Sequence, residues 1–186
     1  MTAAKILFLV LDGISDRPCP SLGGTTPLAA AHKPVLDKLA AEGICGIMDT
    51  IAPGVRPGSD TAHLALLGYD PFKYYTGRGP LECVGTGIDM KPGMIGFRCN
   101  YATLSPDGMI IDRRAGRIHD TEALSKAIQE GIDLLEFGVR VTFRSGAGHR
   151  AALALEGEGL SHCVSSNDPK KEGVTPLKIT PLGWLR

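Results

Sequence analysis

The chain has 186 residues, of which 43% are hydrophobic, and this is enough apolar material for one compact domain or a small pair of domains. Twenty basic and twenty acidic side chains give a formal net charge of zero, and aromatic residues make up 5%, so neither nucleic acid nor an anionic membrane is an expected partner. The five cysteines are odd in number and show no C-x-x-C spacing. We therefore expect reduced thiols in a cytoplasmic protein, not a zinc knuckle or a disulfide framework.

The first predicted element is a buried strand over residues 5–11, a continuous apolar run that Asp12-Gly13 ends. Such a run is typical of a strand covered on both faces in a parallel sheet. It is too short for a signal peptide or a membrane span. Asp12 would lie at the carboxyl end of this strand, where open α/β sheets bind ligands. The alternative is that Asp12 only forms a turn with Gly13.

A helical region and a second strand follow. Thr26-Pro27 predicts the start of a helix, Pro34 should break or restart it, and Gly43 should end it. Residues 44–51 are predicted as a second strand. The resulting β-α-β order implies a right-handed crossover and a parallel sheet.

Ser59 occupies a junction between a loop and a helix. Pro57-Gly58 stops the preceding segment, and residues 61–67 are predicted as the first turns of a helix. The free backbone N–H groups and the helix dipole attract an anion at such a junction. Ser59 is therefore either an N-cap or a nucleophile that handles phosphate.

The character of the chain changes near Cys83, because strand-like segments dominate from there. They cover residues 93–103, 108–112, 139–145 and 149–156, and one helix is predicted from about 121 to 131. This block is typical of an antiparallel sheet with a helix against it, an α+β unit. It is predicted as a second domain inserted after the β-α-β start.

Basic side chains form the second candidate site. Arg113, Arg114 and Arg117 leave a predicted strand and flank a glycine, so they could form a fork for phosphate and carboxylate or simply a solvated turn. His149-Arg150 follows a glycine turn. His149 is either a contact to a substrate phosphate or a surface histidine at a strand start.

Several motifs combine into a family resemblance. They are Leu-Val-Leu-Asp-Gly at 9–13, Arg-Pro-Gly-Ser-Asp-Thr-Ala-His at 56–63, Leu-Gly-Tyr-Asp-Pro at 67–71, Tyr-Thr-Gly-Arg-Gly-Pro at 75–80, Asn-Tyr-Ala-Thr at 100–103, Ile-Asp-Arg-Arg-Ala-Gly-Arg at 111–117, His-Arg-Ala at 149–151 and Asn-Asp-Pro-Lys-Lys at 167–171. Together they resemble the cofactor-independent (2,3-bisphosphoglycerate-independent) phosphoglycerate mutases of archaeal type, in the alkaline phosphatase superfamily.

The resemblance implies an alkaline-phosphatase-like parallel sheet with an inserted substrate domain. Residues 1–82 would be the N-terminal part of the metal-binding α/β domain, and residues 83–172 the α+β substrate domain. Ser59 would accept a phosphoryl group and become phosphoserine. Asp12 and Ser59 would bind two divalent metal ions, manganese, magnesium or zinc. Metal coordination would lower the pKa of the serine hydroxyl, and hard oxygen ligands suit magnesium and manganese.

The implied reaction interconverts 3-phosphoglycerate and 2-phosphoglycerate in glycolysis and gluconeogenesis. Phosphoglycerate would be held through its phosphate and carboxylate by Arg113, Arg114, Arg117, His149 and Arg150. Two alternatives stay open. One is a related phosphatase or a phosphotransferase acting on a small alcohol of the homoserine type, and the other is a catalytically incomplete chain that binds a phospho-ligand or a partner half.

The resemblance covers only the N-terminal part of the family pattern. The family carries a second phosphatase half with further aspartate and histidine metal ligands, so residues 173–186 would be the return linker to a missing C-terminal half. We therefore expect a fragment, a truncated or frame-shifted product, or one half of a split enzyme. Weak or no metal binding, and little activity of this chain alone, would follow. An exposed sheet edge would also favour a homo-oligomer.

Overall fold

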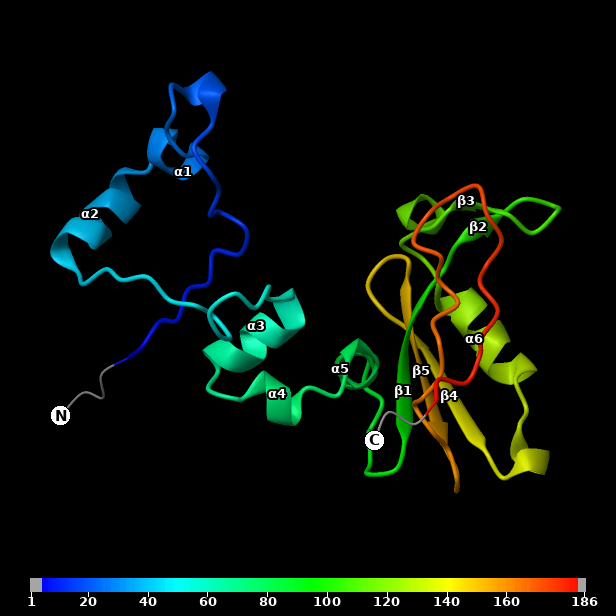
Figure 1. The fold of residues 1–186 in the computed structure, drawn as a ribbon. Helices are drawn as coiled ribbons and strands as arrows, with labels where there is room; N and C mark the ends of the chain where they lie inside the picture. The colour runs from blue at the N-terminus through cyan, green and yellow to red at the C-terminus, as the bar shows by residue number, and fades with distance from the viewer. Residues whose placement is uncertain (1–4, 184–186) are drawn as a thin grey trace. The chain divides into compact units, whose positions relative to one another are not determined.

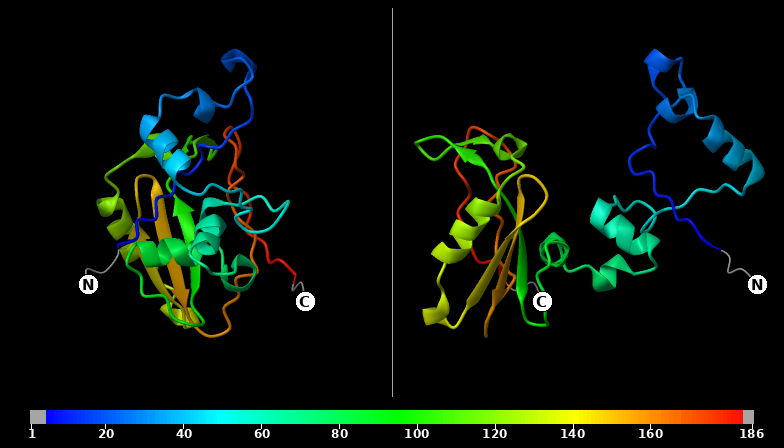
Figure 2. Two further views of the ribbon diagram at one scale, coloured as in Figure 1. Left: turned by 90° about the vertical axis from the view of Figure 1, so that its left-hand side faces the viewer. Right: turned by 180° about the vertical axis from the view of Figure 1, so that it is seen from behind.

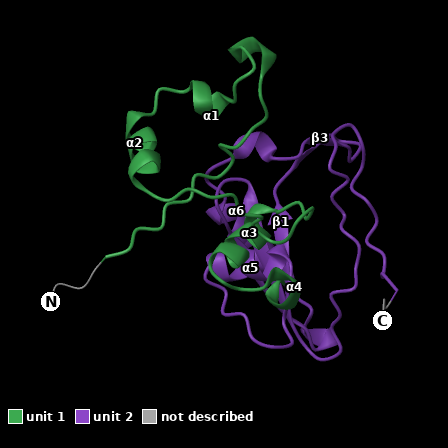
Figure 3. Ribbon diagram, turned by 60° about the vertical axis from the view of Figure 1, so that its left-hand side comes forward, with its two compact units in different colours: residues 1–75 green, residues 76–186 purple. Residues whose placement is uncertain are grey.

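The computed structural model describes residues 5–183 and divides into two compact units, residues 1–75 and residues 76–186 (Figures 1 and 3). The division falls a few residues before the predicted boundary at residue 82. The metal-binding and substrate-binding roles of the two parts stay predictions. No helix among residues 5–183 is long and apolar enough to cross a membrane.

Short helices make up the regular structure of unit 1. They are η1 (Pro20–Leu22), α1 (Pro27–Ala30), α2 (Pro34–Glu42), α3 (Ser59–Leu66) and α4 (Pro71–Tyr74). Proline begins four of them, since its fixed φ suits the first helical turn and its missing N–H is not needed there. Thr26 caps α1 by accepting a hydrogen bond from the Ala29 N–H at 3.1 Å. The predicted interruption at Pro34 is confirmed, because it separates α1 from α2.

The predicted parallel sheet of unit 1 is wrong for this structure. Residues 5–11 and 44–51 form no strands, and every sheet pairing among residues 5–183 is antiparallel. Ile6 is 95% exposed and Ile47 is 104% exposed, and no described residue of unit 1 is buried. An apolar run becomes a strand only where a neighbour pairs with its backbone and covers its side chains. No described segment of unit 1 does this.

Unit 2 contains a three-stranded antiparallel sheet in the order β1-β5-β4, formed by β1 (Ile95–Asn100), β4 (Arg140–Ser145) and β5 (Arg150–Glu156). A small hairpin pairs β2 (Thr103–Leu104) with β3 (Ile110–Asp112). The remaining elements are α5 (Arg78–Gly85), η2 (Ala115–Arg117), α6 (Glu122–Gly131) and η3 (Leu135–Phe137). The predicted antiparallel sheet with a helix against it is therefore confirmed.

Helices α5 and α6 lie on opposite sides of this sheet (Figures 1 and 2). Cys83 of α5 forms the core cluster with Ile88 and with Ala152 and Ala154 of β5. The small alanines let the helix approach the sheet, and alternation along β5 places both on the same face. The chain after the last strand also belongs to unit 2, since the Ile110 N–H donates to the Val174 carbonyl at 2.9 Å. Of the predicted linker 173–186, residues 184–186 lie outside the described residues.

Gln129 of α6 closes the open edge of β4. Its Nε2 donates to the Val141 carbonyl at 3.1 Å, and its Oε1 accepts from the Phe143 N–H at 2.6 Å. One side-chain amide thus replaces the backbone partner that a further strand would offer. This protects the edge from pairing with another chain.

Replacing Gln129 by alanine should lower the free energy of unfolding of the chain by about 1–3 kcal/mol, because two backbone groups lose their partner. The measurement is urea unfolding followed by circular dichroism. Lys126→Ala on the same helix is the control, and it should change the free energy by no more than about 0.5 kcal/mol because the side chain is exposed. Equal losses in the two variants would contradict this role of Gln129.

Candidate functional site

Ser59 is the first residue of α3 and is not its N-cap. Gly58 holds the N-cap position, and its N–H donates to the Thr61 Oγ1 at 3.0 Å. The hydroxyl of Ser59 is therefore not consumed by capping. It donates instead to the Asp12 Oδ2 at 3.4 Å, across 47 residues of sequence. The structure thus brings the two predicted residues of unit 1 together.

Asp12 reaches Ser59 from the turn that follows the apolar run 5–11. Gly13 has a φ of +77°, which lets the chain turn directly after Asp12. Asp12 thus forms the turn that the sequence allowed and also contacts Ser59. A carboxylate and a hydroxyl are hard oxygen donors of the kind that magnesium and manganese prefer. Residues 5–183 contain no group of three or more histidine, cysteine, aspartate or glutamate side chains that could hold a metal ion.

In unit 2, Asp112 shapes the turn that carries the predicted arginines. Its carboxylate accepts from the backbone N–H of Arg114 and of Gly116, both at 2.7 Å. These two hydrogen bonds lower the pKa of Asp112. Arg117 adopts a φ of +57° in the same turn, a backbone conformation that residues other than glycine rarely adopt.

Arg113 is held by a partner that the sequence analysis did not identify. Its Nη2 lies 2.7 Å from the Asp168 Oδ2, and its Nε lies 3.2 Å from Oδ1. This bidentate ion pair fixes the loop around residue 168 against the turn at residues 113–117. The hydrogen bonds from Arg113 lower the pKa of the Asp168 carboxyl.

We expect Asp168→Asn to lower the free energy of unfolding at neutral pH by about 1 kcal/mol, a modest value because the ion pair is about a third exposed. The folded-state pKa lies below the usual value of about 3.9. The contribution of Asp168 is therefore complete above about pH 4 and is lost as the pH falls through the folded-state pKa.

Urea unfolding at pH 7 and at about pH 3 tests this, and the gap between wild type and variant should narrow at the lower pH. Asp120→Asn removes an exposed carboxylate with no ion pair or hydrogen bond among the described contacts, and it serves as the matched control. A gap of the same size at both pH values would contradict the ionic origin of the effect.

His149 is the centre of the second group of predicted residues. Partial burial, followed by the nearby charges of Arg114, Arg150, Arg98 and Arg117, lowers the pKa of its imidazole. The ring is therefore neutral at pH 7 and can donate or accept a hydrogen bond. Its carbonyl accepts from the Tyr101 N–H at 2.8 Å, which anchors it beside the end of β1.

The charges of Arg114, Arg117, Arg150 and Arg98 all act on the imidazole of His149, and we call these five residues the His149 cluster. Arg98 of β1 was missed by the sequence analysis. A single arginine in an apolar strand carries no local signal, and only the strand register reveals its neighbours. Arg113 is the predicted residue whose side chain is engaged elsewhere, by Asp168.

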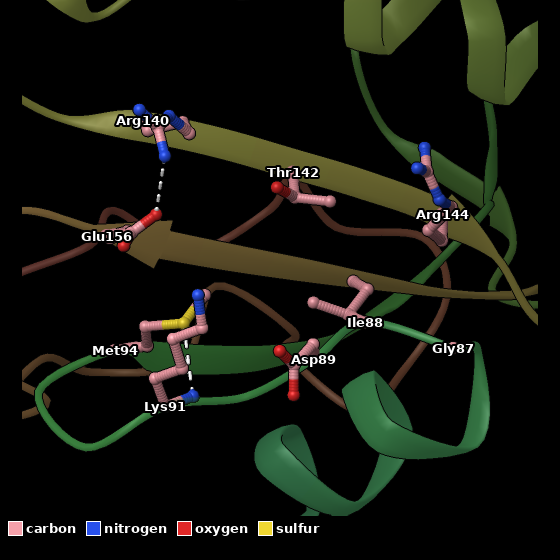
Figure 4. A pocket seen from close by; sticks show the side chains of 9 residues that line it. All are labelled: Gly87, Ile88, Asp89, Lys91, Met94, Arg140, Thr142, Arg144 and Glu156. Carbon is pink, nitrogen blue, oxygen red and sulfur yellow. Dashed lines mark hydrogen bonds and ion pairs between the residues drawn. The ribbon is translucent and has the colours of Figure 1, made fainter.

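A separate cavity of about 240 Å³ opens beside β4 (Figure 4). It is lined by Gly87, Ile88, Asp89, Lys91, Met94, Arg140, Thr142, Arg144 and Glu156. Arg140 and Glu156 form an ion pair of 3.1 Å at its wall. None of the residues predicted for the site lines this cavity.

Comparison with known proteins gives the same family for most of the chain. The family model for 2,3-bisphosphoglycerate-independent phosphoglycerate mutase matches residues 40–184. The mutase of that name from Methanoculleus marisnigri is 70% identical over 181 residues, which are 97% of this chain and 44% of the relative. The corresponding mutase 1 of Methanocaldococcus jannaschii is 52% identical over 98% of this chain and 44% of its own length.

Solved structures agree with these sequence matches. The cofactor-independent phosphoglycerate mutase of Thermoplasma acidophilum is 48% identical with a TM-score of 0.56, over 92% of this chain and 45% of the other. The PH0037 protein of Pyrococcus horikoshii is 34% identical with a TM-score of 0.64, over 78% of this chain and 35% of the other. The chain thus spans less than half the length of the relatives that it matches. It belongs to the 2,3-bisphosphoglycerate-independent phosphoglycerate mutase family.

Proposed function

We propose that this chain supplies the phosphoryl-accepting serine and the substrate-binding arginines of a phosphoglycerate mutase, which interconverts 3-phosphoglycerate and 2-phosphoglycerate in glycolysis and gluconeogenesis. The observation that carries the proposal is the hydrogen bond from the Ser59 Oγ to the Asp12 Oδ2 at the start of α3. It joins a hydroxyl that does not cap the helix to a carboxylate that can accept its proton.

Ser59 acts as the nucleophile of the proposed reaction. Its Oγ forms a bond to phosphorus while the bond from phosphorus to the glycerate oxygen breaks, and that oxygen takes up a proton. The N–H groups of the first turn of α3 face the phosphate, as helix N-termini do in anion sites. Asp12 keeps the hydroxyl oriented and withdraws its proton. Divalent metal ions, held by Asp12 and Ser59 with further ligands, would lower the pKa of the hydroxyl.

Glycerate must be retained while it reorients, so that the phosphoryl group returns to its other oxygen. The guanidinium groups of Arg114, Arg117 and Arg150 match carboxylate and phosphate in shape and charge. Neutral His149 adds a hydrogen-bonding group among these cations. Arg113, whose guanidinium pairs with Asp168, supports this set by holding the turn that carries Arg114 and Arg117.

The proposal is tested with the purified chain, manganese and 3-phosphoglycerate, with enolase reporting 2-phosphoglycerate. The chain is assayed alone and together with the part of the M. marisnigri relative that the match leaves uncovered. We expect metal-dependent turnover in the mixture and little turnover by the chain alone, because residues 5–183 contain no group of three or more histidine, cysteine, aspartate or glutamate side chains that could hold a metal ion.

Three outcomes would contradict the mutase. Release of inorganic phosphate without 2-phosphoglycerate would indicate a phosphatase. Transfer of phosphate to homoserine alone would indicate a phosphotransferase. A stable complex that binds phosphoglycerate without turnover would indicate a catalytically incomplete binding partner.

A further inference from the structure

One face of the sheet in unit 2 carries an arginine from each of its three strands. In the strand register, Arg98 of β1 and Arg144 of β4 both lie opposite Ala152 of β5. Arg150 lies two residues before Ala152, and is therefore the diagonal neighbour of both on the same face. Ala152 itself is fully buried against α5. The three arginines thus lie on the same face of the sheet around Ala152.

Arg98 differs from the other two in its surroundings. Its Nε is buried and has no hydrogen-bond partner in the described structure. The nearest acidic group is Glu82 of α5, whose Oε2 lies 3.7 Å from this nitrogen, too far for a hydrogen bond. Buried donors without an acceptor are rare in native proteins and call for an explanation. One explanation is that Arg98 binds an anionic ligand.

Glu82 lies near both Arg98 and the turn that precedes Arg150. A Cβ atom built on Gly146 would lie 3.3 Å from the Glu82 Oε1 and 3.4 Å from the Arg150 Cβ, so both groups approach the turn at Gly146. The charge of Arg98 also contributes to lowering the pKa of His149. Arg98 and Arg150 therefore both act on His149, and Glu82 is the acidic group paired with Arg98.

We infer that Arg98 is a further anion-binding residue of the His149 cluster, which acts with Arg150 on one phosphate or carboxylate group. The buried Nε–H of Arg98, which has no hydrogen-bond partner in the described structure, contacts the ligand together with the terminal nitrogens of the guanidinium. The ligand class is a small phosphorylated carboxylate. This inference rests on the proposed function and adds to it a residue from β1.

The test is isothermal titration of the chain with 3-phosphoglycerate, inorganic phosphate and glycerate in separate experiments. Arg98→Met should weaken binding of 3-phosphoglycerate about tenfold or more, since a charge-assisted contact is lost. Arg98→Lys should recover part of the affinity, because it keeps the charge without the fork. The matched control is Arg140→Met, which removes an arginine of the same sheet that is 72% exposed and paired with Glu156. Its affinity should stay within about twofold of wild type.

Arg150→Met separates this inference from the proposed function. If Arg150→Met weakens binding and Arg98→Met does not, the inference is overturned and the proposed site stands. If neither variant matters, or the wild-type chain binds none of the three ligands, both are overturned. Should Arg98→Met fail to fold, the Nε–H resonance of Arg98 in the wild-type chain decides. It must shift on addition of phosphate, and an unmoved resonance would refute the contact.

Discussion

Gly79→Ala should destabilise unit 2 by about 3 kcal/mol or more, because the added methyl group has no space against β1. A Cβ atom built on Gly79 would lie 1.9 Å from the Gly96 carbonyl oxygen and 3.0 Å from the Phe97 Cα. Both are backbone atoms of the strand, so no side chain can rotate away. Helix α5 would have to leave the sheet, and the core around Cys83 would open with it. Urea unfolding followed by circular dichroism measures the loss.

Gly85→Ala is the matched control, because Gly85 ends the same helix. A Cβ atom there would meet nothing within 4 Å, and the backbone needs no positive φ. Alanine is the better helix former, so this variant should be as stable as wild type or up to about 1 kcal/mol more stable. If Gly79→Ala behaved like Gly85→Ala, the close packing of α5 on β1 would be disproved.

The elements of unit 2 could be predicted from the sequence because their signals are local. The strands β4 and β5 pair directly and are joined by the glycine turn at 146–148, so the residues between 139 and 156 specify their own hairpin. The place of β1 beside β5 could not be predicted in this way. It depends on contacts between residues about 55 apart, such as Phe97 opposite Leu153.

In unit 1 the local sequence pattern predicted strands that the structure does not contain. The apolar runs at 5–11 and 44–51 satisfied the pattern of buried strands, yet that pattern states only what a strand needs if partners exist. Ile44 is 103% exposed in the structure, since no described segment of unit 1 pairs with it or covers it. Periodicity and composition cannot supply a missing neighbour.

At the candidate site, too, local features could be predicted from the sequence and contacts between distant residues could not. The loop-to-helix junction at Ser59 is a local feature and could be predicted, but the capping position fell on Gly58. The contact of Ser59 with Asp12 was expected only from the family resemblance, because 47 residues separate the two. Arg98 and the Asp168 partner of Arg113 went unpredicted. Both depend on tertiary contacts that no short motif encodes.

Ser59→Ala should abolish formation of phosphoserine and reduce turnover in the reconstituted mixture by about four orders of magnitude or more, since no other group replaces the nucleophile. The fold should survive, because Gly58 and not Ser59 occupies the N-cap of α3, and alanine is a good helix former. The measurement pairs the enolase-coupled rate with mass spectrometry of the peptide that contains residue 59, taken after incubation with 3-phosphoglycerate and manganese.

Two further variants decide what a loss of activity means. Ser21→Ala removes an exposed hydroxyl of η1 and should leave both the rate and the phosphopeptide unchanged. Asp12→Asn keeps an oxygen beside the Ser59 hydroxyl but removes the charge that takes up its proton, so the rate should fall by about two orders of magnitude or more. If Ser59→Ala kept its rate, or if phosphate appeared on a different residue, the nucleophile would lie elsewhere. The hydrogen bond between Ser59 and Asp12 would then serve only to hold α3 against the turn at Gly13.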